Sequence, residues 1–215
     1  MWDGYQNGSI LLVCKRCSFG KVITLHDAAT KDPTPWDTWA RALQLFGPVR
    51  DGWRVGFFAA PNKRDLTGAT VVGPEHVNGG YAYPCQPQTI IVYRTEECTR
   101  VLLHELFHAA CTDRQQELPH MESETESWAE WMLVALASGG DIALAKKLFA
   151  KQLHWVARLN KTLRAAPFAI SQPSDFAWRY TLGREDAYCR LGAIVPVSHA
   201  TPTTSSRLTH IDLEI

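Results

Sequence analysis

An HExxH motif lies inside an apolar, helix-forming run, Val101-Leu102-Leu103-His104-Glu105-Leu106-Phe107-His108-Ala109-Ala110. Side chains four positions apart lie on one helical face, so His104 and His108 can present both imidazoles to a single metal ion. Glu105 follows the first histidine, where its carboxylate can take a proton from a metal-bound water and pass it to a leaving amine. Burying these polar groups is costly unless they bind a metal, and we therefore expect a zinc site.

The residues around the motif also favour a buried helix. Residues 89–93 read Thr-Ile-Ile-Val-Tyr and predict a strand. Thr95, followed by Glu96 and Glu97, predicts a helix N-terminus with a capping hydroxyl and an acidic first turn. A helix with apolar residues on two flanks belongs in a core.

Composition limits the classes of function. The chain has 215 residues, 46% of them hydrophobic, which suffices for a sizeable core. Lysine plus arginine and aspartate plus glutamate both number 22, so no bulk charge favours nucleic acid or a membrane surface. We find no signal-peptide pattern or membrane span, and six irregularly spaced cysteines do not predict a disulfide framework. These features predict a cytoplasmic protein with reduced cysteines.

The N-terminal region predicts a hairpin whose tip carries a CxxC motif. Residues 9–13 and 21–25 read as strands, with Cys14 and Cys17 between them. A structural zinc site needs four ligands, and His26, Cys85 or Cys189 could complete one only through the fold. The alternative is two reduced cysteines in a hairpin.

Further strands and one helix are predicted before the motif. A helix over residues 36–46 is stopped by Gly47-Pro48, and a strand over 53–60 is followed by a short strand over 69–72. Residues 79–83 and 88–94 predict a hairpin directly before the metal helix. We therefore expect an N-terminal antiparallel or mixed sheet.

The part after the motif is expected to be mostly helical. Helices are predicted over residues 123–137, 142–164 and 174–191, with Asp141 as a cap and a loosening at Gly183. The fold class is thus α+β, with one domain over 1–195, the hairpin of 9–25 as an appendage, and a tail over 196–215 that is mobile or docked as an edge strand.

A catalytic zinc needs a third protein ligand, which leaves the fourth position to water. Candidates are His120, Glu122, Glu124, Glu126 and Glu130. Glu126 and Glu130 stand one helical turn apart and share a face, so one helix can present both carboxylates inward.

His104-Glu105-Leu106-Phe107-His108 followed by Glu126-Ser-Trp-Ala-Glu130 resembles the gluzincin branch of zinc metallopeptidases. The resemblance covers about thirty residues and implies a zincin-like fold with Zn²⁺ as cofactor. It also implies that Glu126 is the third ligand and that Glu130 orients a zinc-bound histidine. A similarity to the SprT-like group would instead make His120 the third ligand. Metzincins require a glycine and a histidine where this chain has Cys111 and Arg114.

These features predict a zinc metallopeptidase acting on a peptide or protein substrate. Glu105 is the expected general base and acid, and an extended peptide is expected to pair with residues 88–94 as an edge strand. The candidate oxyanion stabilisers are Tyr180, Tyr188, Arg179 and His154. The alternative is an SprT-like or other regulatory protein in which zinc is structural.

Overall fold

The computed structural model of the chain describes residues 2–113, 117–193 and 200–211. The chain divides into two compact units. Of the described residues, the first unit comprises 2–63 and 79–112, and the second comprises 64–78, 113, 117–193 and 200–211. The expected single domain over 1–195 stays a prediction, because two compact units can belong to one domain.

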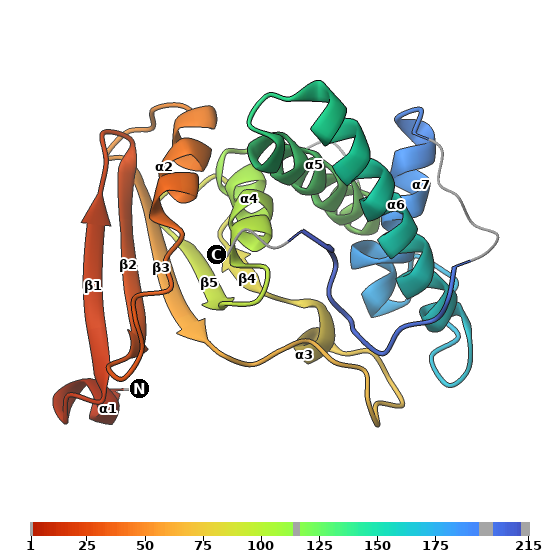
Figure 1. Cartoon of the computed structure of the whole chain (residues 1–215), viewed down its shortest axis with the longest axis horizontal. Coiled ribbons are helices and arrows are strands. Elements are labelled where there is room, and N and C mark those ends of the chain that lie inside the picture. Colours follow the sequence, from red (N-terminus) through yellow and green to blue (C-terminus); the bar gives the residue numbers. More distant parts are fainter. Residues whose placement is uncertain (1, 114–116, 194–199, 212–215) are drawn as a thin grey trace. The chain divides into compact units, whose positions relative to one another are not determined.

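The first unit contains a five-stranded sheet in the order β1-β2-β3-β5-β4 (Figure 1). Its strands are β1 (Ile10–Arg16), β2 (Gly20–Asp27), β3 (Trp53–Ala60), β4 (Gly80–Ala82) and β5 (Ile90–Arg94). Strands β2, β3 and β5 run parallel, and β1 and β4 pair antiparallel with their neighbours at the two edges. The α+β class with a mixed sheet is therefore confirmed.

Three strand predictions need correction. The hairpin of residues 9–25 is not an appendage, because β2 pairs with β3 from Gly20↔Trp53 to Thr24↔Phe57. Residues 69–72 form bends and turns instead of a strand. The strand predicted over 88–94 is β5, and it lies between β3 and β4, so the edge strand beside it is β4.

Two helices of the first unit form its core with the sheet. They are α2 (Trp36–Leu45) and α4 (Cys98–Ala109), and a short α1 (Trp2–Gln6) precedes β1. The buried Trp39 of α2 packs on Phe57 with 5.0 Å between ring centroids, and its Nε1 donates to Thr99 Oγ1 of α4 at 3.0 Å. These contacts fix α4 against the sheet.

The start of α4 differs from the prediction. The residue that precedes the helix is Glu97, which adopts a left-handed conformation with φ 60°, and the first helical turn has no acidic residue. Thr95 does not cap the helix, since the N-cap position is two residues later at Glu97 and no side chain accepts a capping hydrogen bond there. The N–H and the hydroxyl of Thr95 instead donate to the Ala60 carbonyl at the end of β3. The predicted capping residue is thus hydrogen-bonded to the sheet and not to the helix.

The second unit is mostly helical. Its elements are α3 (Pro74–Val77), α5 (Leu118–Ser138), α6 (Ile142–Arg164), the 3₁₀-helix η1 (Phe176–Tyr180) and α7 (Leu182–Arg190). Helix α6 is confirmed, with Asp141 Oδ1 accepting from Leu144 N at 3.0 Å. Helix α5 begins earlier than predicted, so His120 lies in its first turn and not in a loop. The helix predicted over 174–191 is interrupted at Thr181.

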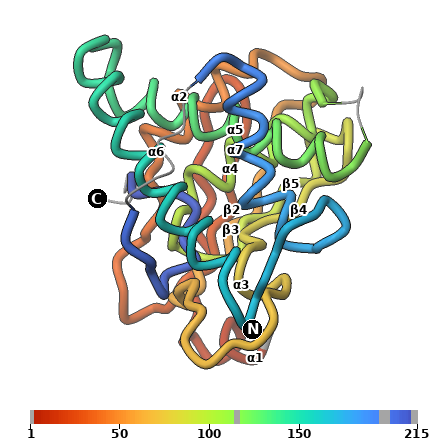
Figure 2. Tube along the Cα trace, turned by 90° about the vertical axis from the view of Figure 1, so that its right-hand side faces the viewer, coloured from red at the N-terminus to blue at the C-terminus, as the bar shows by residue number. Residues whose placement is uncertain are grey.

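The described part of the C-terminal tail packs along α6, as Figure 2 shows for the dark blue trace. Gln152 Nε2 and Trp155 Nε1 donate to the carbonyls of Leu208 and Arg207 at 2.8 and 2.9 Å. Leu208 is fully buried in the apolar core of this unit. The tail is therefore part of the second unit. Positions 196–199 and 212–215 of the predicted tail lie outside the described residues.

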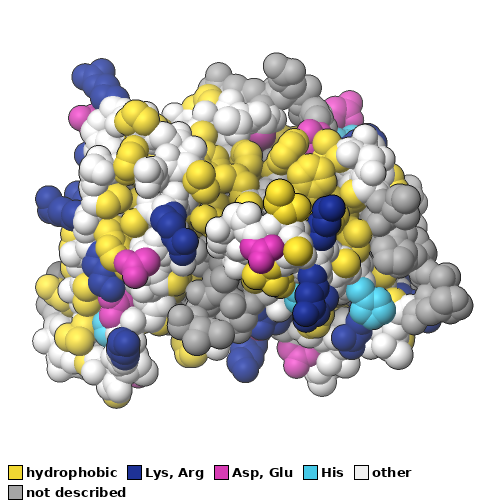
Figure 3. Space-filling model, turned by 45° about the horizontal axis from the view of Figure 1, so that its top comes forward, with side chains coloured by type: hydrophobic (Ala, Val, Ile, Leu, Met, Phe, Trp, Pro, Cys, Tyr) yellow, Lys and Arg dark blue, Asp and Glu magenta, His cyan; other side chains and the backbone are white. Residues whose placement is uncertain are grey.

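Surface charge agrees with the balanced composition. On the face shown in Figure 3, Lys and Arg side chains lie among acidic and apolar ones and form no single basic patch. Within the described residues, no helix is both long and apolar enough to cross a membrane.

Candidate metal centre

The two histidines of the HExxH motif converge inside the first unit. His104 Nε2 and His108 Nε2 lie 2.8 Å apart, and both side chains are buried. Two nitrogens bound tetrahedrally to one zinc ion at about 2.0–2.1 Å lie about 3.3 Å apart, so a small ring movement admits the ion. Paired imidazoles are donors that suit zinc, and the histidine pair therefore fits the expected metal.

The carboxylate of Glu105 lies against β4. A Cβ atom placed on Gly80 would stand 2.8 Å from Glu105 Oε1 and 2.5 Å from Val101 Cγ1. Only a glycine allows the strand to approach α4 so closely. Because β4 is an edge strand, Glu105 is positioned next to a strand with one open side.

Three tyrosines lie on β4 and β5 or just beyond, and the sequence analysis did not single them out. Burial and then the negative charge of Glu105 raise the pKa of Tyr93, which places this phenol within electrostatic reach of the candidate base. A hydrogen bond with Tyr83 raises the pKa of Tyr81 to about 12. Tyr93 thus stays a neutral hydroxyl donor at physiological pH.

A disulfide lies at the C-terminal end of α4 and joins Cys85 to Cys111. The backbone N–H groups of these two cysteines donate to the His108 carbonyl at 2.9 and 3.1 Å. The expectation of reduced, unpaired cysteines is therefore wrong for this pair. The disulfide and both hydrogen bonds hold the helix end that carries the second histidine.

The acidic candidates for a third ligand lie on α5 in the second unit. Glu126 and Glu130 are both buried, as expected for a helix that presents carboxylates inward. Glu130 Oε2 lies 3.5 Å from Arg184 Nη1, and neither side chain is exposed to solvent. Glu130 therefore has a role within its own unit, holding α5 to α7.

Two of the other candidates on α5, His120 and Glu124, contact α7 or its neighbour η1. The His120 ring packs on Trp178 with centroids 5.5 Å apart, and Glu124 lies 4.0 Å from Arg190. Among the predicted oxyanion stabilisers, Tyr188 is fully buried, with its ring stacked on Trp131. Tyr188 is thus a packing residue of the second unit.

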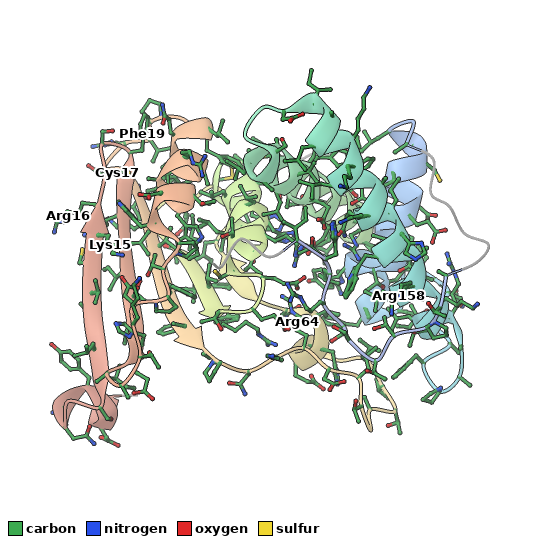
Figure 4. All side chains as sticks on the ribbon, in the orientation of Figure 1. Lys15, Arg16, Cys17, Phe19, Arg64 and Arg158 are labelled. Atoms are coloured by element: carbon green, nitrogen blue, oxygen red, sulfur yellow. A yellow bond between two sulfur atoms is a disulfide. The ribbon has the colours of Figure 1, made fainter. Side chains whose placement is uncertain are left out.

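Among the described residues, no group of three or more His, Cys, Asp or Glu side chains that could hold a metal ion includes Cys14 or Cys17. Cys14 is exposed and Cys17 is half-buried near the tip of the hairpin, where Figure 4 labels it. Cys85 belongs to the disulfide and cannot complete such a site. Cys14 and Cys17 form no disulfide.

No protein-family model matches the chain, and comparison with curated proteins and with solved structures finds no match either. The candidate metal centre therefore rests on the residues of this chain alone. Within the first unit these are His104, Glu105 and His108 on α4, with Gly80 and Tyr93 on the adjacent strands.

Proposed function

We propose that the protein is a zinc-dependent metallopeptidase with a zincin-like fold. The observation that carries the proposal is the convergence of His104 Nε2 and His108 Nε2 at 2.8 Å on a buried helix, with Glu105 next to an edge strand. Two imidazoles and an adjacent carboxylate are the groups that metal-assisted peptide hydrolysis needs.

The third ligand in this proposal is Glu126 of α5. Its carboxylate is buried, and a helical carboxylate is a suitable ligand for zinc beside two histidines. His120, Glu122 and Glu124 are the alternatives, all on the same helix. Glu130, one turn beyond Glu126, would accept a hydrogen bond from a ligand histidine and so orient its ring.

Zinc, when bound, polarises the scissile carbonyl and lowers the pKa of a bound water towards about 7. Glu105 takes the proton of the attacking water and delivers it to the departing amine. The substrate backbone pairs with the open side of β4, since β5 is interior to the sheet. The negative charge of Glu105 contributes to the raised pKa of Tyr93, and the Tyr93 hydroxyl is the proposed donor of a hydrogen bond to the reacting group.

The experiment is cleavage of a peptide library by the purified full-length chain loaded with zinc. We expect cleavage that a chelator abolishes and that Glu105→Gln reduces by about 10²–10⁴-fold while zinc content and fold are retained. Glu75→Gln, at an exposed glutamate of α3, is the matched control and should leave cleavage unchanged. If the zinc-loaded protein cleaves no peptide, or Glu105→Gln changes nothing, the metal is structural and the peptidase proposal fails.

A further inference from the structure

Strand β4 lies at the edge of the sheet beside α4, with one side open for pairing (Figure 1). On its other side, Tyr83 N donates to Thr89 O at 3.3 Å, just beyond the end of the β4–β5 pair. Hydrogen-bonded positions alternate along an antiparallel pair. Since Gly80 and Ala82 alternate with Tyr81 and Tyr83, they direct their backbone N–H and C=O groups toward the open side of β4.

The side chains along β4 alternate between the two faces of the sheet. Gly80 faces α4, where an added Cβ atom would stand 2.8 Å from Glu105 Oε1. Tyr81 and Tyr83 belong to the opposite face and are 39% and 48% exposed. Their ring centroids lie 4.9 Å apart in a T-shaped contact. An exposed aromatic pair thus begins one residue away from the position that contacts the candidate base.

A peptide that adds a strand to this edge places one of its residues directly opposite Tyr81. If the peptide runs antiparallel and bonds to Gly80 and Ala82, the pair at Tyr81 is a non-hydrogen-bonded one, in which the two side chains come closest. Two aromatic rings in such a pair attract each other beyond the effect of the area they bury, and a small side chain gains none of this. Ile91, the partner of Tyr81 on β5, is half-buried and adds apolar surface on the same face.

We propose that the protein selects peptides with an aromatic side chain at one fixed position, which lies opposite Tyr81 when the peptide pairs antiparallel with β4. The adjacent residue of the peptide then lies opposite Gly80, beside Glu105, so the aromatic residue stands close to the cleaved bond. Tyr81 is the specificity-determining residue, and Tyr83 packs against its ring. This specificity rests on the proposed function, in which the substrate occupies the open side of β4.

Peptide binding is measured apart from cleavage, on the ¹⁵N-labelled full-length chain kept free of zinc by a chelator. The probes are two blocked heptapeptides of threonine and lysine that differ only in a central phenylalanine or alanine. NMR titration should show that the phenylalanine peptide binds about five- to tenfold more tightly than the alanine peptide. The amide protons of Gly80 and Ala82 should move downfield as they bond to the peptide backbone.

Two variants separate the ring of Tyr81 from its hydroxyl. Tyr81→Ser removes the ring and should bind the two peptides within about twofold of each other, whereas Tyr81→Phe keeps the ring and should retain the preference. Tyr5→Ser, at an exposed tyrosine of α1, is the matched control and should retain it as well. With zinc bound, Tyr81→Ser should raise KM for peptides with the aromatic residue and leave kcat unchanged.

The specificity is overturned if the phenylalanine peptide fails to bind, if both peptides bind equally, or if Tyr81→Ser keeps the full preference. A different result would remove the peptidase alone. If the peptides bind as expected and the zinc-loaded protein cleaves no member of a peptide library, the proposed function fails while the aromatic selectivity of the β4 edge stands.

Discussion

Gly80 of β4 lies directly against Glu105 of α4, so closely that any side chain at position 80 would collide with the candidate base. The collision would involve Glu105 Oε1 at 2.8 Å, Val101 Cγ1 at 2.5 Å and the Ile91 carbonyl oxygen at 2.8 Å. Backbone atoms and packed side chains surround Gly80, so a methyl group added there must displace at least one of these neighbours. Of these neighbours, the Glu105 carboxylate is the one that lies beside the open edge of β4.

The first prediction is that Gly80→Ala impairs catalysis. The methyl group should push Glu105 away from its position and reduce peptide cleavage about 10–100-fold, because a shift of about 1 Å in a catalytic group costs this much. It should also lower the free energy of unfolding by about 1–3 kcal/mol through overpacking. Cleavage rates and urea unfolding measure the two effects.

Gly56→Ala is the matched control in the same sheet. Its Cβ would meet Ile91 Cδ1 at 3.0 Å, the end of a flexible side chain that can move. We expect cleavage by this variant to stay within about twofold of the wild type. If Gly80→Ala cleaves as well as Gly56→Ala does, the close approach of β4 has no part in positioning Glu105.

The second prediction concerns zinc content. Glu126→Ala should abolish catalytic zinc binding, because it removes a ligand, while Glu130→Ala should retain zinc with about 10–100-fold weaker affinity. His120→Ala and Glu122→Gln should bind zinc as the wild type does. Elemental analysis of the dialysed variants measures the stoichiometry. Full zinc in Glu126→Ala, together with loss in another of these variants, would reassign the third ligand to that residue.

The third prediction separates the structural role of Glu130 from its proposed metal role. Glu130→Ala leaves the fully buried Arg184 without this carboxylate and should lower the free energy of unfolding by about 3–5 kcal/mol, even without zinc. Glu124→Ala removes a half-exposed partner of Arg190 on the same helix and should cost about 0–1 kcal/mol. If Glu130→Ala and Glu124→Ala lower the free energy of unfolding equally in chelator-treated protein, Glu130 and Arg184 do not form a stabilising buried ion pair.

The fourth prediction concerns the disulfide next to His108. Cys85 and Cys111 are 26 positions apart, and closing a loop of this length stabilises a protein by about 3–4 kcal/mol. Cys85→Ser/Cys111→Ser should lose about this much and release the His108 carbonyl, so zinc affinity should fall as well. Cys14→Ser/Cys17→Ser changes two unpaired cysteines of the hairpin and should have little effect. Equal stability of both double variants would indicate that the disulfide does not form.

Local signals in the sequence predict the elements well. The run of apolar residues after Asp141 predicts α6 as it is observed, and the hairpin predicted before the motif is β4 and β5. Pairing between distant strands leaves no such signal: β2 and β3 are separated by α2, and nothing in either strand indicates that they run parallel. The edge position of β4 follows from this pairing, and the prediction that residues 88–94 form an edge strand is therefore wrong.

The candidate metal centre likewise has features that local sequence signals predict and features that depend on distant parts of the chain. The spacing within HExxH places both imidazoles on one face because helix geometry is local. The pairing of Cys85 with Cys111 and the closeness of Gly80 to Glu105 depend on how β4 meets α4, which one sequence does not encode locally.

The last prediction is a pH dependence of stability that arises from His210. Burial, and then the positive charges of Lys151 and Arg207, lower the pKa of His210 from 6.5 to about 4 in the folded protein. Between these pH values the unfolded chain binds a proton that the folded chain does not, so the free energy of unfolding falls as the pH falls from 6.5 to 4. Because the ring is only half-buried, solvent screening leaves about 1–2 kcal/mol of this effect.

In His210→Asn the amide can still donate to Gln152 Oε1, as Nδ1 does at 2.9 Å, but it does not titrate. Urea unfolding at neutral and mildly acidic pH should therefore show a smaller loss for the variant than for the wild type. Identical losses would mean that His210 titrates alike in both states, and an NMR titration of its ring would show that directly.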